Sequence, residues 1–247
     1  MNPVSIATAH FVQSLLTSHY WRGDELRSRT VSGAILSGML DLPLPSRRLE
    51  ADWERDTHSA LGNEGGNVEA LSLVRTRARW PELKSCVIAL SSWMHSQGMA
   101  DVLAASDMAL MACRGTRYHH DGARYGGSAF CNLFLSEDKG LDVHFPVTGH
   151  RIPLKRGTVV VFDTCQPHAV VPRDSSAFDP AYFAPGVDCT QVFLTWELPM
   201  EDPDVARELG VSFDIDKSAS HQTEEQLWLN GRPAELDADS GRWLMAD

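Results

Sequence analysis

A histidine and an aspartate two residues apart, His119 and Asp121, are the residues best placed to do chemistry. On a β-strand, residues i and i+2 point to the same face, so one strand could direct this imidazole and this carboxylate at one point. A third candidate, His168, follows an apolar segment at 157–163 and begins another segment of strand formers. The spacing therefore permits a site with three ligands.

Two histidines and one carboxylate on one side of a metal leave the opposite coordination positions open. This is the ligand set of mononuclear non-haem Fe(II) oxygenases, in which O₂ and a cosubstrate must both reach the iron. A lone H-x-D pair is also compatible with a turn that carries solvated side chains. The strands between Asp121 and His168 favour the metal site.

Residues 108–198 resemble the superfamily of 2-oxoglutarate-dependent Fe(II) oxygenases, whose fold is a double-stranded β-helix, or jelly roll. The resemblance rests on the segments 119–121, 129–135, 157–172 and 190–198. It implies that His119, Asp121 and His168 are the iron ligands and catalytic residues, and that 2-oxoglutarate is the cosubstrate. It also implies that Asn132 lies where a polar side chain often contacts 2-oxoglutarate.

One departure from the superfamily concerns the far carboxylate of 2-oxoglutarate. An arginine early on the closing strand usually pairs with it, because a planar guanidinium fork suits a carboxylate. Residues 186–192 contain no basic residue here. The alternatives are Arg117, Arg124 and Arg173. Arg117 shares the parity of His119, whereas Arg173 would face outwards unless a bulge intervenes. Either one of these binds the cosubstrate, or the cosubstrate is not 2-oxoglutarate.

Other candidate residues have simpler interpretations. His120, between the first two ligands, should face the opposite side of the strand. Asp142 and His144 form a second same-face pair near His150, but no third ligand stands in the position that the family uses. The loop at 174–188 could form a lid over the metal or a plain surface insertion.

The elements that must position these residues fall into three regions. We expect a single domain with residues 1–105 as a helical support region, 106–199 as the jelly-roll catalytic core and 200–247 as an acidic C-terminal extension. The predicted strands of the core are 108–113, 128–135, 141–145, 158–162, 169–172 and 190–198.

Two helices and a hairpin are predicted outside the core. Helical spacing from Phe11 to Tyr20 indicates one helix, and a second should begin near Pro81 and end near Gly98. The pair Asn230 and Gly231 favours a terminal hairpin. The predicted fold class is α+β with a mainly β, cupin-like core and N-terminal supporting helices.

Composition excludes several classes of protein. The 247 residues have a formal net charge of −11, which argues against a nucleic-acid footprint. No apolar segment is long enough to span a membrane. The five cysteines are scattered and odd in number, which fits a reducing, cytoplasmic location. The last 47 residues hold 12 acidic and 4 basic side chains, so the acidity belongs mainly to the C-terminal extension.

These observations predict a cytoplasmic non-haem Fe(II) dioxygenase that uses 2-oxoglutarate and O₂ to hydroxylate or oxidise a small-molecule or peptide substrate. Two alternatives remain open. One is a cupin-like metalloenzyme that does not use 2-oxoglutarate, and the missing arginine favours it. The other is a non-catalytic binding or regulatory jelly-roll protein. The sequence does not indicate the substrate or the oligomeric state.

Overall fold

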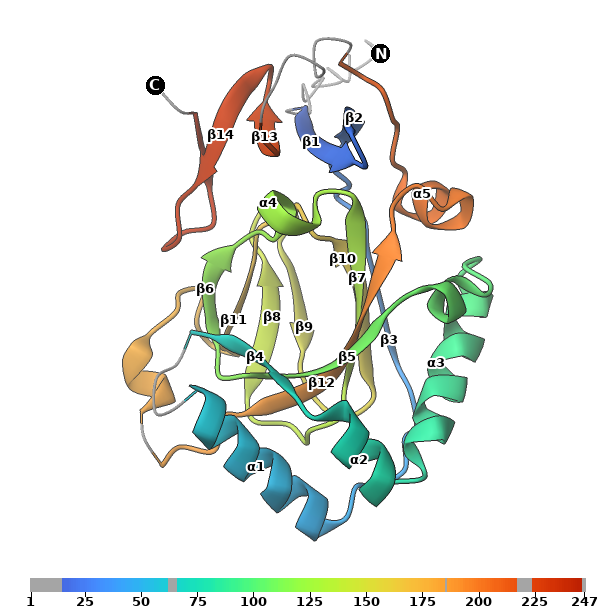
Figure 1. Ribbon diagram of the computed structural model, residues 1–247. Coiled ribbons are helices and arrows are strands. Elements are labelled where there is room, and N and C mark those ends of the chain that lie inside the picture. Colours follow the sequence, from blue (N-terminus) through green and yellow to red (C-terminus); the bar gives the residue numbers. More distant parts are fainter. Residues whose placement is uncertain (1–14, 62–65, 185, 217–223, 246–247) are drawn as a thin grey trace, which may run out of the picture.

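Two antiparallel sheets built from eight consecutive strands form the centre of the protein (Figure 1). The structure is a computed structural model that describes residues 15–61, 66–184, 186–216 and 224–245. The eight strands are β5 Met108–Cys113, β6 Thr116–His119, β7 Ser128–Phe134, β8 Leu141–Phe145, β9 His150–Pro153, β10 Thr158–Asp163, β11 His168–Pro172 and β12 Gln191–Pro199.

The strand order identifies the fold as a jelly roll. The larger sheet contains β10-β7-β12-β5 in that order, and the smaller sheet contains β6-β11-β8-β9. The chain thus crosses repeatedly between two facing sheets, as in the double-sheet jelly roll. Strands β3 (Ile35–Met39) and β4 (Val68–Leu71) extend the two edges of the larger sheet. The predicted mainly β, double-stranded β-helix fold is confirmed.

The larger sheet is apolar on both faces, which explains its continuous hydrophobic runs. In β10, Val159 and Val161 belong to a core between the sheet and the helices, whereas Val160 and Phe162 belong to the core between the two sheets. A strand buried on both sides cannot show the alternation of a half-exposed strand. The sequence 158–163 is accordingly buried at every position.

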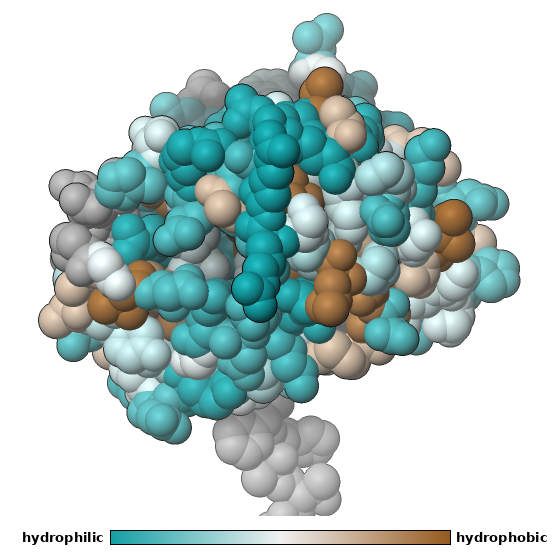
Figure 2. Space-filling view, turned by 90° about the horizontal axis from the view of Figure 1, so that it is seen from below, coloured by the Kyte–Doolittle hydropathy of each residue, from teal (hydrophilic) through white to brown (hydrophobic). Residues whose placement is uncertain are grey.

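Helices cover the outer face of the larger sheet (Figure 1). These are α1 (Arg47–Leu61), α2 (Leu73–Arg79) and α3 (Leu83–Ser96). The helix predicted to follow Pro81 is α3, and it ends just before Gly98, whose φ of 83° suits glycine. Seen from below, over this end of the molecule, the surface is mostly hydrophilic and its apolar side chains are scattered (Figure 2).

The expected N-terminal helix is wrong for the residues that the structure describes. Residues 11–14 lie outside them, but Leu16–Arg22 is strand β1, and Glu25–Thr30 is strand β2. β1 pairs with β2 on one side and with β13 (Gln226–Leu229) on the other. Pairing on both sides overrides the helical spacing of the apolar side chains, because a strand between two partners has hydrogen-bond partners for its backbone groups. The described part of residues 1–105 therefore mixes strands with helices.

Both ends of the described chain form one further sheet. Its order is β15-β14-β13-β1-β2, with β14 at Arg232–Leu236 and β15 at Trp243–Met245. The predicted hairpin is confirmed, and Asn230 and Gly231 have the positive φ values that a tight turn requires. In Figure 1 this sheet lies above the short helix α4 (Gly122–Tyr125).

The remaining ordered elements are helical. α5 is Pro203–Leu209, and two 3₁₀ turns, η1 and η2, span Val102–Ala105 and Pro180–Phe183. Among the described residues, no helix is long and apolar enough to cross a membrane.

Gly157, which directly precedes β10, lies close to the backbone of Leu40, and a substitution can test this close approach. Its φ is 86°, and a Cβ there would lie 2.0 Å from the backbone oxygen of Leu40. We expect Gly157→Ala to lower the free energy of unfolding by about 2–4 kcal/mol in urea titrations. Gly149→Ala is the matched control, because Gly149 has a φ of 72° but no neighbour within 4 Å. Equal losses in the two variants would contradict the close approach.

The five cysteines, all free and buried, give a second test. Burial raises the pKa of Cys86 to about 11 and those of Cys113 and Cys165 to about 12. We therefore expect no reaction with Ellman's reagent in the native state at pH 8 and five reactive thiols in guanidinium chloride. Rapid reaction of any thiol in the folded protein would contradict its burial.

The thiols of Cys86, Cys113 and Cys165, whose pKa burial raises, predict alkaline sensitivity. In the unfolded chain they ionise near their usual pKa, while the folded thiols stay protonated, so above pH 9 the unfolded state binds fewer protons. The free energy of unfolding should fall as the pH rises from 9 to 10.5, by about 1 kcal/mol per thiol and pH unit. Cys113→Ala should show a shallower decline, and an unchanged slope would argue against this cause.

Candidate metal centre

Three candidate ligands converge at one end of the jelly roll. His119 is the last residue of β6, Asp121 lies in the turn before α4, and His168 is the first residue of β11. β6 and β11 are neighbours in the smaller sheet, and His119 is paired with His168. One ligand atom from each of the three side chains lies within 4.8 Å of the other two. The Nε2 atom of His168 is 3.6 Å from the Oδ2 atom of Asp121.

The convergence arises differently from the expected strand geometry. β6 ends at His119, and Asp121 has a φ of −99° and a ψ of 5°, which are values of a turn. Its backbone N–H donates to the carbonyl oxygen of Thr164 at 2.8 Å, and its own carbonyl accepts from the N–H groups of Arg124 and Tyr125. The turn, held from the loop before His168, therefore brings the carboxylate to the histidines.

A hydrogen bond to a backbone carbonyl orients each of the two histidines. The Nδ1 atom of His119 is 2.8 Å from the carbonyl oxygen of Arg117, and that of His168 is 3.0 Å from the carbonyl oxygen of Gln166. A carbonyl only accepts, so each Nδ1 is the donor and each Nε2 carries the free lone pair. Hydrogen bonds of this kind fix ring orientation and tautomer in metal-binding histidines.

Burial shifts the pKa of His168 and that of Asp121 in opposite directions. It lowers the pKa of His168 well below its usual value, and the neighbouring His119 lowers it further. Burial also raises the pKa of the Asp121 carboxyl, an effect opposed by His119 and His120. The buried imidazole of His168 and the desolvated carboxylate of Asp121 are ligand types that a divalent metal binds. The donor set therefore fits a metal ion.

A cavity of about 330 Å³ lies between the two sheets beside these ligands. Its walls are mostly apolar and include Met111, Phe134, Val143, Phe162, Val170 and Phe193. The ring of Phe162 lies edge-on to that of His168, with centroids 4.8 Å apart. Such walls exclude water from the side of the ligands that faces the cavity.

Several polar side chains besides the candidate ligands also line this cavity. Asn132 on β7 and Thr195 on β12 are paired in register and both line it. The Oδ1 atom of Asn132 is buried and has no hydrogen-bond partner among the described residues. Besides Asp121, the charged lining residues are Arg124 and Glu197, and burial raises the pKa of Glu197. Asn132 therefore presents a free acceptor to a molecule in the cavity.

The three arginines suggested by the sequence have different surroundings. Arg124, on α4, lines the cavity. Arg117 points away, where it forms an ion pair with Asp239 and lies over the ring of Phe178. Arg173 forms ion pairs with Asp138 and Asp142 outside the cavity. Of the three, Arg124 is therefore the one that a ligand in the cavity could meet.

The second carboxylate–imidazole pair does not form a site. Asp142 forms ion pairs with Arg173 and Arg151. The Nδ1 atom of His144 is hydrogen-bonded to the hydroxyl oxygen of Tyr118 at 2.5 Å. Within the described ranges, Asp142, His144 and His150 do not bring three ligand atoms together.

His120 and the aromatic residues of the loop at 174–188 lie outside the cavity. His120 packs 5.3 Å from the ring of Trp243 and does not line the cavity. In the loop at 174–188, Phe178 stacks on Phe183, which is buried in the core, and neither lines the cavity. Thr195 and Glu197 have no motif that could have identified them from sequence.

Comparisons with known proteins give only remote likenesses. No family model matches the chain, and no curated protein matches it. Among solved structures, a Pseudomonas putida prolyl-4-hydroxylase is 17% identical with a TM-score of 0.40, over 67% of this chain and 92% of that one. With identities and TM-scores this low, such likenesses identify neither a reaction nor a substrate of this chain.

Two further solved structures are similar at the same level. A viral collagen prolyl hydroxylase from Paramecium Bursaria Chlorella virus-1, in a 2OG complex, is 12% identical with a TM-score of 0.38, over 67% of this chain and 96% of that one. A non-heme alpha ketoglutarate dependent carbocyclase from nogalamycin biosynthesis is 12% identical with a TM-score of 0.36, over 84% and 90%.

Proposed function

We propose that this chain is a non-haem Fe(II) oxygenase whose iron ligands are His119, Asp121 and His168. The observation that carries the proposal is the convergence of the three ligand atoms within 4.8 Å beside an apolar cavity. Both imidazoles donate from Nδ1 to backbone carbonyls, which leaves Nε2 of each for the metal. When bound, Fe(II) would supply the activation of O₂.

The chain's own residues would prepare the site for that chemistry. His168 is held neutral by burial, so it is a ligand without first losing a proton. Asp121 supplies the negative charge that offsets the metal. The aromatic and aliphatic walls exclude water from the reacting group, which is an organic part of a small-molecule or peptide substrate.

We further propose 2-oxoglutarate as cosubstrate, with Arg124 as the partner of its far carboxylate and Asn132 as an additional contact. Both line the cavity, and Arg124 is the arginine among its lining residues. A guanidinium forms strong charge-assisted hydrogen bonds with a carboxylate.

One observation favours the cupin-like alternative that does not use 2-oxoglutarate. Residues 186–192, which lead into the closing strand, contain no basic residue, and the ring of Phe193, which follows them, packs 5.1 Å from that of Phe134. This part of the closing strand therefore offers no cation to a carboxylate. If the protein binds neither iron nor 2-oxoglutarate, the non-catalytic alternative applies.

We also propose a cytoplasmic location, which the five free cysteines support. The net charge of −11 supports a partner other than nucleic acid.

Substitution of the ligands tests the metal centre. In anaerobic calorimetric titrations with Fe(II) or Co(II), we expect one metal per wild-type chain. His168→Ala and Asp121→Ala should each weaken binding by more than the roughly 10–100-fold that results from losing an outer partner. His144→Ala is the control, since His144 bonds to Tyr118 outside the site. Unchanged affinity in the His168 or Asp121 variant would overturn the ligand assignment.

Titration of 2-oxoglutarate into the anaerobic Fe(II) protein tests the cosubstrate. A weak visible charge-transfer band should grow to saturation. Arg124→Met should raise the half-saturating concentration by about 10–100-fold, the loss expected for a hydrogen bond to a charged group. Arg117→Met, which removes an arginine that pairs with Asp239, should leave it unchanged.

The possible outcomes separate the proposals. Iron binding without a band would reject 2-oxoglutarate and support the cupin-like alternative, and absence of iron binding would support the non-catalytic one. A normal titration in Arg124→Met would reject that arginine as the partner of the carboxylate.

A further inference from the structure

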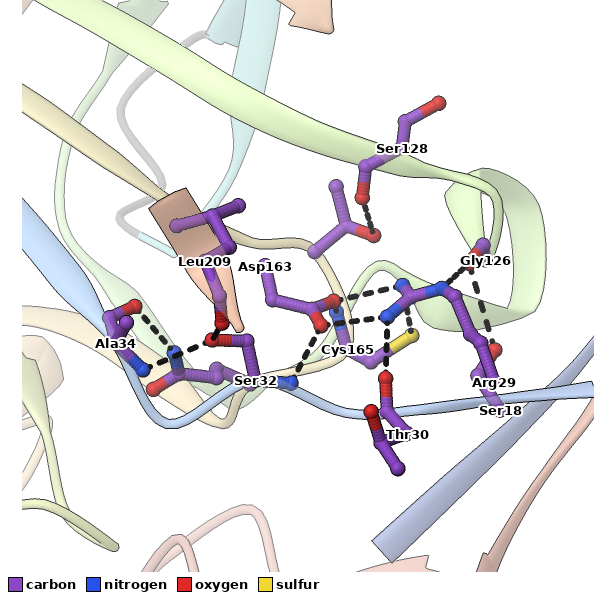
Figure 3. A network of polar contacts seen from close by, with 12 residues as sticks. Ser18, Arg29, Thr30, Ser32, Ala34, Gly126, Ser128, Asp163, Cys165 and Leu209 are labelled. Atoms are coloured by element: carbon purple, nitrogen blue, oxygen red, sulfur yellow. Dashed lines mark hydrogen bonds and ion pairs between the residues drawn. The ribbon is translucent and has the colours of Figure 1, made fainter. Parts of the chain in front are cut away.

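An ion pair excluded from water joins Arg29 on β2 to Asp163 at the end of β10 (Figure 3). Both side chains have no exposed surface. The two carboxylate oxygens accept from the two terminal nitrogens of the guanidinium at 2.6 and 2.8 Å. This paired geometry is the strongest arrangement that arginine and a carboxylate form.

Every polar hydrogen of the Arg29 guanidinium has a partner. Besides Asp163, Nε donates to the carbonyl oxygen of Gly126 at 2.7 Å, Nη1 to that of Thr30 at 3.0 Å, and Nη2 to the sulfur of Cys165 at 3.4 Å. Arginine has five N–H donors, and all five are used here. The guanidinium is therefore fixed in position and orientation.

Both carboxylate oxygens of Asp163 also accept hydrogen bonds from the backbone. Its Oδ1 atom also accepts from the backbone N–H of Cys165 at 2.9 Å, and its Oδ2 atom accepts from the backbone N–H of Ser32 at 2.8 Å. The backbone carbonyl of Asp163 accepts from the N–H of Gln166. Asp163 thus shapes the tight turn that runs from β10 to His168.

The partners of the pair belong to the two segments that carry the metal ligands. Gly126 directly follows α4, the helix that begins after Asp121, so the Arg29–Gly126 bond holds the Asp121 segment. The Asp163–Cys165 bond holds the turn whose Gln166 carbonyl orients His168. A third bond, from the N–H of Asp121 to the carbonyl of Thr164, joins the two segments directly.

We propose that Arg29 and Asp163 are positioning residues that set the placement of Asp121 relative to His168. The inference rests on the proposed function, since it concerns the geometry of the same ligands. It adds that a residue from the strand pair at the start of the described chain controls the metal affinity of the jelly roll. Neither residue contacts a ligand side chain, so both act through backbone.

The test compares variants that separate positioning from stability. Arg29→Met removes all five donors, and Arg29→Lys keeps the charge but has three donors that cannot reproduce the fork. Arg27→Met is the matched control, because Arg27 lies on the same strand and pairs with Glu201 and Asp214 instead. Leu49→Ala is the stability control, because Leu49 is a buried core residue of α1, at the opposite end of the molecule from α4 in Figure 1.

Two readouts are measured at a temperature where each variant is folded. The first is the Co(II) dissociation constant, which should rise by about 10–100-fold in Arg29→Met and less in Arg29→Lys. The second is amide hydrogen exchange of the metal-free protein, which should quicken together in 120–127 and 163–168. Neither control should change either readout, although Leu49→Ala should lower the melting temperature.

The outcomes distinguish the two proposals. Arg29→Lys with wild-type affinity and wild-type exchange in both segments would overturn the positioning role, even if Arg29→Met did not fold. A similar affinity loss in Leu49→Ala would reduce Arg29 to a general stabilising residue and also overturn it. Failure of the wild-type protein to bind Co(II) would reject the metal centre, while hydrogen exchange would still decide whether Arg29 holds both segments.

Discussion

Burying a guanidinium and a carboxylate together is the constraint around which this protein is arranged. Removing two charges from water costs several kcal/mol for each ion, and the cost is offset only where the geometry is good and every remaining donor and acceptor is satisfied. Arg29 and Asp163 meet that condition with partners from β2, β10, the turn before His168 and the residue after α4. The need to satisfy the pair therefore fixes several segments at once, and two of them carry the candidate metal ligands.

The second determinant of the site is its apolar surroundings. Phe145 and Phe162 flank His168, and their burial of the imidazole keeps it neutral. The same burial raises the pKa of Asp121, an effect that a bound cation would oppose. An interior of this kind strengthens electrostatic interactions with whatever enters it.

Much of the fold could be predicted from sequence because its strands carry strong local signals. Segments such as 108–113 and 141–145 coincide with β5 and β8, since strand formers are bounded there by turn residues. Strand β1 of the terminal sheet could not be predicted, because one of its partners, β13, lies more than 200 residues away and its own apolar spacing suits a helix. Short strands such as β6 and β9 lack enough residues to show a pattern.

The candidate site could likewise be predicted from the sequence only in part. His119, Asp121 and His168 could be selected from residue type and spacing, although Asp121 reaches its position through a turn and not through a shared strand. The environments of Arg117 and Arg173 depend on acidic partners far along the chain, such as Asp239 for Arg117 and Asp142 for Arg173, that spacing does not reveal. Arg29 has no local signal, because its role exists only when β2 packs against the end of β10 and the residue after α4.

Anomalous X-ray diffraction from crystals of the Fe(II)-loaded protein, recorded on both sides of the iron absorption edge, tests the central claim most directly. The account predicts one strong iron peak bonded to Nε2 of His119, Nε2 of His168 and a carboxylate oxygen of Asp121, with the open coordination positions facing the apolar cavity. An iron peak elsewhere, or none at these three residues in fully loaded protein, would contradict it.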